Sequence, residues 1–134
     1  MTKNVTDILF YFFFKYIKRN CIEEHANLAS VHNELENNFL IGLLPSTTTR
    51  CWLGVQDAEG QWLWSDGTPY DYSNWCSNEP NNLNVENCGE INWTDRCWND
   101  ASCSTSMGYV CFLNFSLQNI LNLNLLILRH SLNQ

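Results

Sequence analysis

Hydrophobic residues recur at every fourth position near the start of the chain. Phe13, Ile17 and Cys21 would share one face of a helix over residues 12–24, because residues four apart lie one turn apart on the same side. The pattern predicts an amphipathic helix there. A short extended link is expected to follow at residues 27–31.

A second helical pattern carries clearer start and stop signals. Asn33 can cap this helix, and Glu36, further along the chain, can complete a capping box. Pro45 ends the pattern, because proline cannot continue a helix. The apolar positions that we expect to form its buried face are Leu35, Phe39 and Leu43.

The pattern changes after residue 46, where short aromatic-rich pieces alternate with turns. Residues 51–55 and 61–65 predict two strands on either side of a turn at 58–60. Residues 108–113 predict a final strand. Helices come first and strands follow, which is the order of an α+β domain.

Between residues 65 and 100 the periodicity is weak, and Asp, Asn, Gly, Pro and Trp are frequent. Irregular segments of this length are uncommon in compact domains unless they carry function. Trp75, Trp93 and Trp98 are large enough to give such a loop a local core. We therefore expect an ordered, functional loop region.

Composition narrows the class of protein. The chain of 134 residues has room for one domain, and 45% of its residues are hydrophobic, so we expect a globular chain. Its formal net charge of −7 would repel a phosphate backbone, which argues against nucleic acid as a partner. No segment reaches the run of about 20 apolar residues that a membrane helix needs, so no membrane span is expected.

The chain contains seven cysteines at irregular spacings and no C-x-x-C pair. This usage predicts a disulfide framework formed in an oxidising compartment, and therefore an extracellular, secreted protein. Residues 1–20 lack the small-residue cleavage site of a signal peptide, so the expectation of secretion rests on the cysteines. A zinc site is the competing interpretation, disfavoured because its candidate thiolates are not closely paired; these are Cys88, Cys97, Cys103 and Cys111.

Acidic and amide side chains gather in the second half of the loop region. Glu79 and Asn81 flank Pro80, and a cis bond at proline could turn both side chains the same way. Three carboxylates and two amide carbonyls suit calcium, which takes about six to eight oxygen ligands in irregular geometry. The candidate ligands are Glu79, Asn81, Glu86, Asn99 and Asp100.

Several short motifs lie along residues 21–111. They are Leu28-Ala29-Ser30-Val31, Glu34, Glu36, Trp52-Leu53-Gly54, Trp64-Ser65-Asp66-Gly67, Glu79-Pro80-Asn81, Glu86-Asn87-Cys88, Trp98-Asn99-Asp100 and Gly108-Tyr109-Val110-Cys111. Taken together, these motifs resemble a C-type lectin-like domain. The resemblance implies a C-type lectin fold, with two helices, small antiparallel sheets and a long calcium-binding loop region stapled by disulfides.

The resemblance also implies a function. In this family the five candidate residues bind calcium with Pro80 in the cis form, and two adjacent sugar hydroxyls complete the coordination. A Glu-Pro-Asn triplet accompanies mannose-type glycans, whereas Gln-Pro-Asp would suggest galactose. Such a shallow site binds one monosaccharide weakly, so oligomerisation could add avidity.

An enzyme is not expected. Glu79 and Glu86 could in principle act as the acid and nucleophile of a glycosidase, but bound calcium would neutralise the pair. His32 has no Ser or Cys partner and is expected to be an ordinary solvated residue rather than a catalytic base.

The family pattern further implies three disulfides, which pair Cys21 with Cys111, Cys88 with Cys103, and Cys76 with Cys97. The third pair matches soluble lectins related to type II antifreeze proteins, so an ice-binding protein is the alternative function. Cys51 is left over. It is expected to be either a buried small hydrophobe, which we favour, or half of an intermolecular bridge.

The ends of the chain depart from the family pattern. Residues 1–20 form an atypical segment in place of the usual first strand and the start of the first helix, residues 21–113 form the domain, and residues 114–134 have no counterpart. Our hypothesis is that both ends reflect a truncated or mis-spliced gene model. The last segment is expected to be unplaced and disordered.

Overall fold

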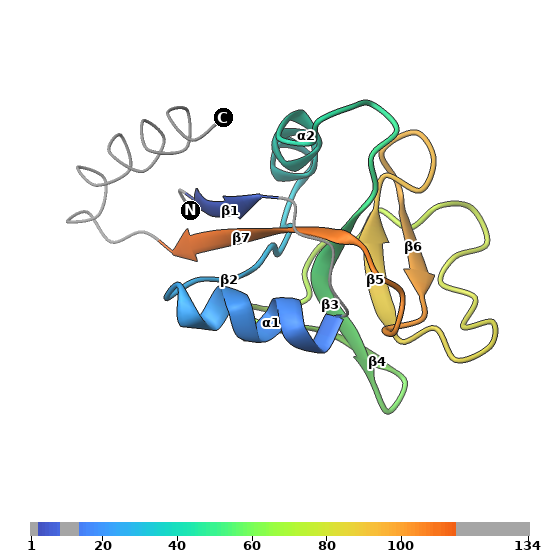
Figure 1. The fold of residues 1–134 in the computed structure, drawn as a ribbon. Coiled ribbons are helices and arrows are strands. Elements are labelled where there is room, and N and C mark those ends of the chain that lie inside the picture. Colours follow the sequence, from blue (N-terminus) through green and yellow to red (C-terminus); the bar gives the residue numbers. More distant parts are fainter. Residues whose placement is uncertain (1–2, 9–13, 115–134) are drawn as a thin grey trace.

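The computed structural model describes residues 3–8 and 14–114, and Figure 1 shows their arrangement. An α+β fold is confirmed, with helices α1 (Phe14–Glu23) and α2 (Glu34–Gly42). The strands are β1 (Lys3–Ile8), β2 (Asn27–Leu28), β3 (Cys51–Ala58), β4 (Gln61–Trp64), β5 (Cys88–Ile91), β6 (Trp98–Ala101) and β7 (Gly108–Asn114).

The strands form one connected sheet in the order β1-β7-β3-β5-β6, with β2 paired to β7 and β4 paired to β3. Most pairs are antiparallel, as expected, but β3 and β7 run parallel, with Cys51 opposite Gly108. This parallel pair was not predicted, because strands so far apart in the sequence leave no local turn signal. Figure 1 shows α1 and α2 on opposite sides of β7, with the long loop region at the β5–β6 end.

The expectation that the first strand is missing was wrong. β1 lies antiparallel to β7, from Lys3 opposite Asn114 to Ile8 opposite Val110, with a register shift between Val5 and Asp7. The edge of β7 offers unpaired backbone groups, which can pair with any extended segment whatever its side chains. The proposed boundaries at residues 20 and 114 stay predictions, and residues 9–13 and 115–134 lie outside the described part of the chain.

The first predicted helix is confirmed from residue 14 onward. Ile17 and Cys21 are fully buried, and Cys21 forms a disulfide with Cys111 on β7. Phe14 is also buried and packs edge-on against Trp52, with ring centroids 5.6 Å apart. Phe13, which the pattern also assigned to this face, lies outside the described residues.

The cap of α2 is confirmed, but its predicted buried face is not. Asn33 Oδ1 accepts a hydrogen bond from the Glu36 amide at 2.8 Å. Leu35 is nevertheless 81% exposed and Phe39 49% exposed, whereas Asn37 and Leu40 are buried.

The reason for this rotation of α2 is a polar contact. Trp98 Nε1 donates to Asn37 Oδ1 at 2.7 Å in the interior, so the buried face of α2 is the one that carries Asn37, on the side of the helix opposite Leu35 and Phe39. Burying Asn37 is tolerable because its carbonyl oxygen is hydrogen-bonded.

Trp98 is the centre of an aromatic cluster beneath the long loop. Its ring lies 5.6–5.8 Å from the rings of Trp64, Trp75 and Tyr72. Trp75 and Trp98 therefore belong to the local core that the sequence predicts. Trp93 was wrongly assigned to it: this side chain is exposed, and the Arg50 guanidinium lies over its ring at 4.4 Å.

His32 anchors the start of the long loop, contrary to the expectation of a solvated side chain. Its Nδ1 lies 2.7 Å from Asp71 Oδ1, and its Nε2 lies 3.0 Å from Thr68 Oγ1. The imidazole is mostly buried. These contacts fasten the loop at residues 68–71 to the link before α2.

The structure contains the three disulfides that the resemblance implies: Cys21–Cys111, Cys76–Cys97 and Cys88–Cys103. The zinc alternative was wrong, because all four of its candidate thiolates are bridged. Cys51 is free and buried, which agrees with the favoured interpretation. Within the described ranges, no helix has both the length and the apolar character needed to cross a membrane.

Candidate functional site

Asp100 joins the strand β6 to the Glu-Pro-Asn segment. The residue is completely buried and lies opposite Gly89 in the β5–β6 pair. Its Oδ1 accepts a hydrogen bond from the Asn81 amide at 3.1 Å, and its Oδ2 accepts one from the Asn82 amide at 2.6 Å. A buried carboxylate thus fixes the backbone of the loop to the sheet.

The Glu79–Pro80 peptide bond is cis, as predicted. Asn81 Nδ2 donates to Glu79 Oε1 at 2.5 Å, so the two side chains do turn toward each other across the proline. Glu79 Oε2 is shielded from solvent and has no hydrogen-bond partner among the described residues. A buried carboxylate oxygen without a partner is costly.

Glu79, Glu86 and Asp100 together form what we call the carboxylate corner. The surroundings of Glu79 in this corner disfavour its negatively charged form. Burial, the largest cause, raises the pKa of Glu79 to about 7, and the neighbouring carboxylates of Asp100 and Glu86 contribute to this rise. The pKa of Glu86 is also raised, first by burial and then by the charge of Asp100.

The loop between the triplet and Glu86 is closed by side-chain to backbone hydrogen bonds. Asn81 Oδ1 accepts from the Leu83 amide at 3.0 Å, and Asn82 Oδ1 accepts from the Glu86 amide at 2.9 Å. Asn82 and Asn84 have positive φ angles, which asparagine adopts more readily than most residues. The loop thereby brings Glu86 back toward Asp100.

Asn99 is oriented by a charged pair that the sequence analysis missed. Asn99 Nδ2 donates to Glu90 Oε1 at 2.9 Å, so the amide nitrogen faces Glu90 and the carbonyl oxygen remains an acceptor. Glu90 is fully buried and accepts from Arg50 Nε at 2.7 Å and Arg50 Nη2 at 3.1 Å. The register that puts Glu90 opposite Asn99 could not be found from local motifs.

The donor set fits calcium, although within the described ranges no three His, Cys, Asp or Glu side chains gather as a metal site. The ligands that the sequence predicts are hard oxygens, and the charges of Asp100 and Glu86 are close enough to raise the pKa of Glu79. Glu79 Oε2 is an acceptor that no donor among the described residues occupies. A divalent cation would relieve this repulsion.

Comparisons with known proteins agree with this fold. The model of the lectin C-type domain family matches residues 14–112, so the chain belongs to this family of domains. At the family level, this membership supports carbohydrate binding.

Among its relatives is the galactose-specific lectin nattectin of Thalassophryne nattereri, 39% identical over 100 residues, which are 70% of this chain and 63% of nattectin. Ladderlectin of Oncorhynchus mykiss is 44% identical over 96 residues, which are 66% of this chain and 50% of ladderlectin. The chain therefore spans about half to two thirds of these relatives. The solved structure of herring type II antifreeze protein superposes with a TM-score of 0.76 at 27% identity, covering 85% of this chain and 91% of that one.

Proposed function

We propose that this domain binds a calcium ion through its clustered carboxylate and amide oxygens and uses it to bind sugar hydroxyls. The observation that carries the proposal is the shielded, unpartnered oxygen of Glu79 beside Asp100 and Glu86. Calcium bound there would polarise the hydroxyls of a glycan. The residues that would hold it are Glu79, Asn81, Glu86, Asn99 and Asp100.

We further propose that the preferred glycans are mannose-type. The triplet places a carboxylate at Glu79 and an amide at Asn81, so a hydroxyl can donate to the first and accept from the second. This order is opposite to the Gln-Pro-Asp triplet expected for galactose. Nattectin is named as galactose-specific, so the triplet and this relative make different predictions, and both sugars must be tested.

The test compares retention on immobilised mannose and immobilised galactose in CaCl₂ and in EDTA. We expect retention on mannose in calcium and release by EDTA. The variant Glu79→Gln/Asn81→Asp should lose mannose and gain galactose. Glu24→Gln removes one exposed carboxylate elsewhere and should behave as the unaltered protein. Retention on mannose that persists in EDTA would refute the calcium mechanism.

Ice binding is the second candidate function. It is supported by the likeness to herring type II antifreeze protein and by the Cys76–Cys97 disulfide, which matches that group. Thermal hysteresis of the freezing point, measured with and without calcium, distinguishes the two functions. Its absence under both conditions removes this candidate.

We propose a binding protein without enzymatic activity that works outside the cell. Three disulfides in one small domain are typical of oxidising compartments. Its partners would be glycans or glycoproteins that display several copies of the sugar, because repeated weak contacts raise the total affinity.

A further inference from the structure

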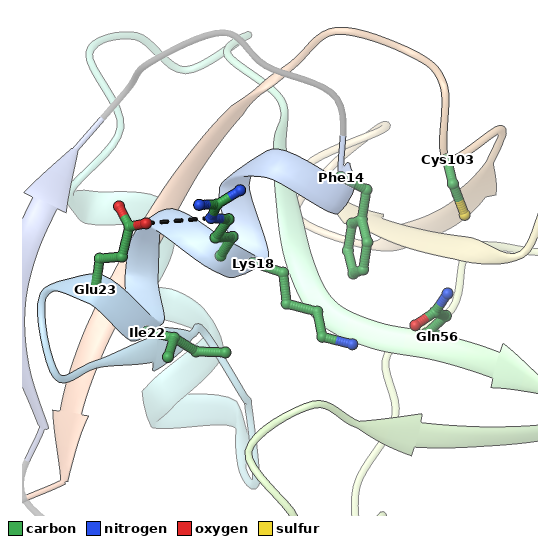
Figure 2. Close-up of a pocket in the computed structure, with 7 residues that line it drawn as sticks. Phe14, Lys18, Ile22, Glu23, Gln56 and Cys103 are labelled. Atoms are coloured by element: carbon green, nitrogen blue, oxygen red, sulfur yellow. Dashed lines mark hydrogen bonds and ion pairs between the residues drawn. The ribbon is translucent and has the colours of Figure 1, made fainter.

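A cavity lies beside α1, and none of the residues proposed to bind calcium lines it. Its volume is about 600 Å³, within the range of small-molecule sites, roughly 300–1,000 Å³. Figure 2 shows it between α1, the strand β3 and the segment that carries Cys103. It shares no residue with the proposed calcium site, so the two can be tested separately.

Much of the cavity wall is apolar. Phe14 contributes a ring that is fixed from behind by Trp52. Ile22 stands at the side of the cavity and is 58% exposed, although isoleucine is usually buried. An apolar wall of this kind favours a ligand with a hydrocarbon part.

Four polar side chains also line the cavity, namely Lys18, Arg19, Glu23 and Gln56. Lys18 and Gln56 line the cavity, and Figure 2 shows the Lys18 ammonium directed toward the Gln56 amide. In the described part of the chain neither side chain has a hydrogen bond or ion pair. Arg19, by contrast, forms an ion pair with Glu23, with 3.2 Å between Arg19 Nε and Glu23 Oε1. One ammonium group and one amide are therefore available to a ligand.

The charge of this face differs from that of the whole chain. The chain has a net charge of −7, yet two of the three charged residues that line the cavity are cationic: these are Lys18 and Arg19, beside the acidic Glu23. Arg19 and Glu23 are paired with each other, so the Lys18 ammonium gives the cavity a local excess of positive charge. An anionic head group on an apolar chain complements both features.

We propose that this cavity binds a long-chain fatty acid. The carboxylate would accept hydrogen bonds from the Lys18 ammonium and the Gln56 amide, and the hydrocarbon chain would lie against Phe14 and Ile22. Charge-assisted hydrogen bonds of this kind are about twice as strong as neutral ones, so the ionised head group should decide the affinity.

The test is titration of the full chain with monomeric oleate, followed by calorimetry in EDTA without sugar. We expect saturable binding of one oleate per chain and at least about tenfold weaker binding of oleyl alcohol, which lacks the charge. Lys18→Gln should weaken oleate binding by about tenfold, and Ile22→Ser should weaken it less. The control variant Arg96→Gln removes one exposed positive charge from a residue that does not line the cavity, and it should leave the affinity unchanged.

Equal affinity for oleate and oleyl alcohol, or an unchanged affinity in Lys18→Gln, would overturn the proposal. Binding to anionic phospholipid vesicles without binding to monomeric oleate would overturn it in favour of a membrane-surface contact. Near-ultraviolet circular dichroism checks that each variant is folded. Glu79 does not line the cavity. Loss of mannose retention in Glu79→Gln with intact oleate binding would therefore support two separate sites.

Discussion

Ionisation of Glu79 is disfavoured, because its carboxyl group is partly buried and lies near the carboxylates of Asp100 and Glu86. Its pKa is raised from 4.5 to about 7, so the folded protein binds the proton more tightly than the unfolded chain. In EDTA, this tighter proton binding stabilises the folded state. The stabilisation is complete below about pH 4.5 and is lost as the pH rises through about 7.

Calcium must displace that proton. We therefore expect calcium affinity to be constant above about pH 8 and to fall by up to about tenfold per pH unit below about pH 7. Calorimetric titration with CaCl₂ across this range measures it. Glu79→Gln has no proton to displace there, so its weaker binding should depend less on pH; a profile as steep as that of the unaltered protein would contradict the assignment.

Cys51 is the only thiol that the three disulfides leave free. Burial, and secondarily the charge of Glu90, raises the pKa of this thiol to about 12. Because the thiolate is the reactive form, iodoacetamide at about pH 8 should leave the native protein unmodified. In urea without reductant, one thiol per chain should react, as counted by mass spectrometry. A disulfide-linked dimer on a non-reducing gel would show instead that Cys51 bridges two chains.

Local motifs were sufficient to nominate the triplet residues and Asp100, because these side chains interact within the loop and its neighbouring strand. They were insufficient for Arg50 and Glu90. Those two residues are forty positions apart in the chain, and only the pairing of β3 with β5 brings them together. The role of Glu90 in orienting Asn99 is a property of strand register, which no short pattern encodes.

At the scale of elements, α2 separates what hydrophobic spacing can predict from what it cannot. The helix and its cap followed from Asn33 and Pro45, but the rotation of the helix about its axis was wrong. The Asn37–Trp98 hydrogen bond sets that rotation, and a buried amide is invisible to a pattern of apolar residues. β1 was missed for a similar reason, since backbone pairing with β7 compensates for a weak strand pattern.

The rotation of α2 gives a matched pair of variants. Leu40 is fully buried, whereas Leu35 is mostly exposed. Leu40→Ala should lower the free energy of unfolding by about 2–5 kcal/mol, because it removes packed methyl groups and leaves a cavity. Leu35→Ala should change it by no more than about 0.5 kcal/mol. Urea unfolding followed by tryptophan fluorescence measures both free energies. A larger loss of stability in Leu35→Ala than in Leu40→Ala would instead support the buried face that the hydrophobic spacing predicts.

At the scale of the whole molecule, covalent links hold the sheet and loop together. The Cys21–Cys111 bridge closes a separation of 90 residues between α1 and β7, and the other two bridges hold the loop region. In the chain-entropy model, these links stabilise the fold by about 3–4.5 kcal/mol each. Within the loop region that these bridges hold, the carboxylates of Asp100 and Glu86 lie close enough to Glu79 for their charges to raise its pKa.

Calcium should therefore stabilise the entire domain and not only its loop. A ligand that binds only the folded state, present at about 100 times its dissociation constant, adds about 2.7 kcal/mol to the free energy of unfolding. We expect the melting temperature to be higher in CaCl₂ than in EDTA, by several degrees, with a smaller effect from MgCl₂ because magnesium requires stricter geometry. Differential scanning calorimetry measures the shift.

Two variants serve as the test and its control. Glu86→Gln should reduce the shift in melting temperature and Glu24→Gln should not, because only Glu86 shares the carboxylate corner with Asp100. Equal melting temperatures in CaCl₂ and EDTA would mean that the clustered carboxylates do not bind calcium at these concentrations, and the sugar proposal would then lose its basis.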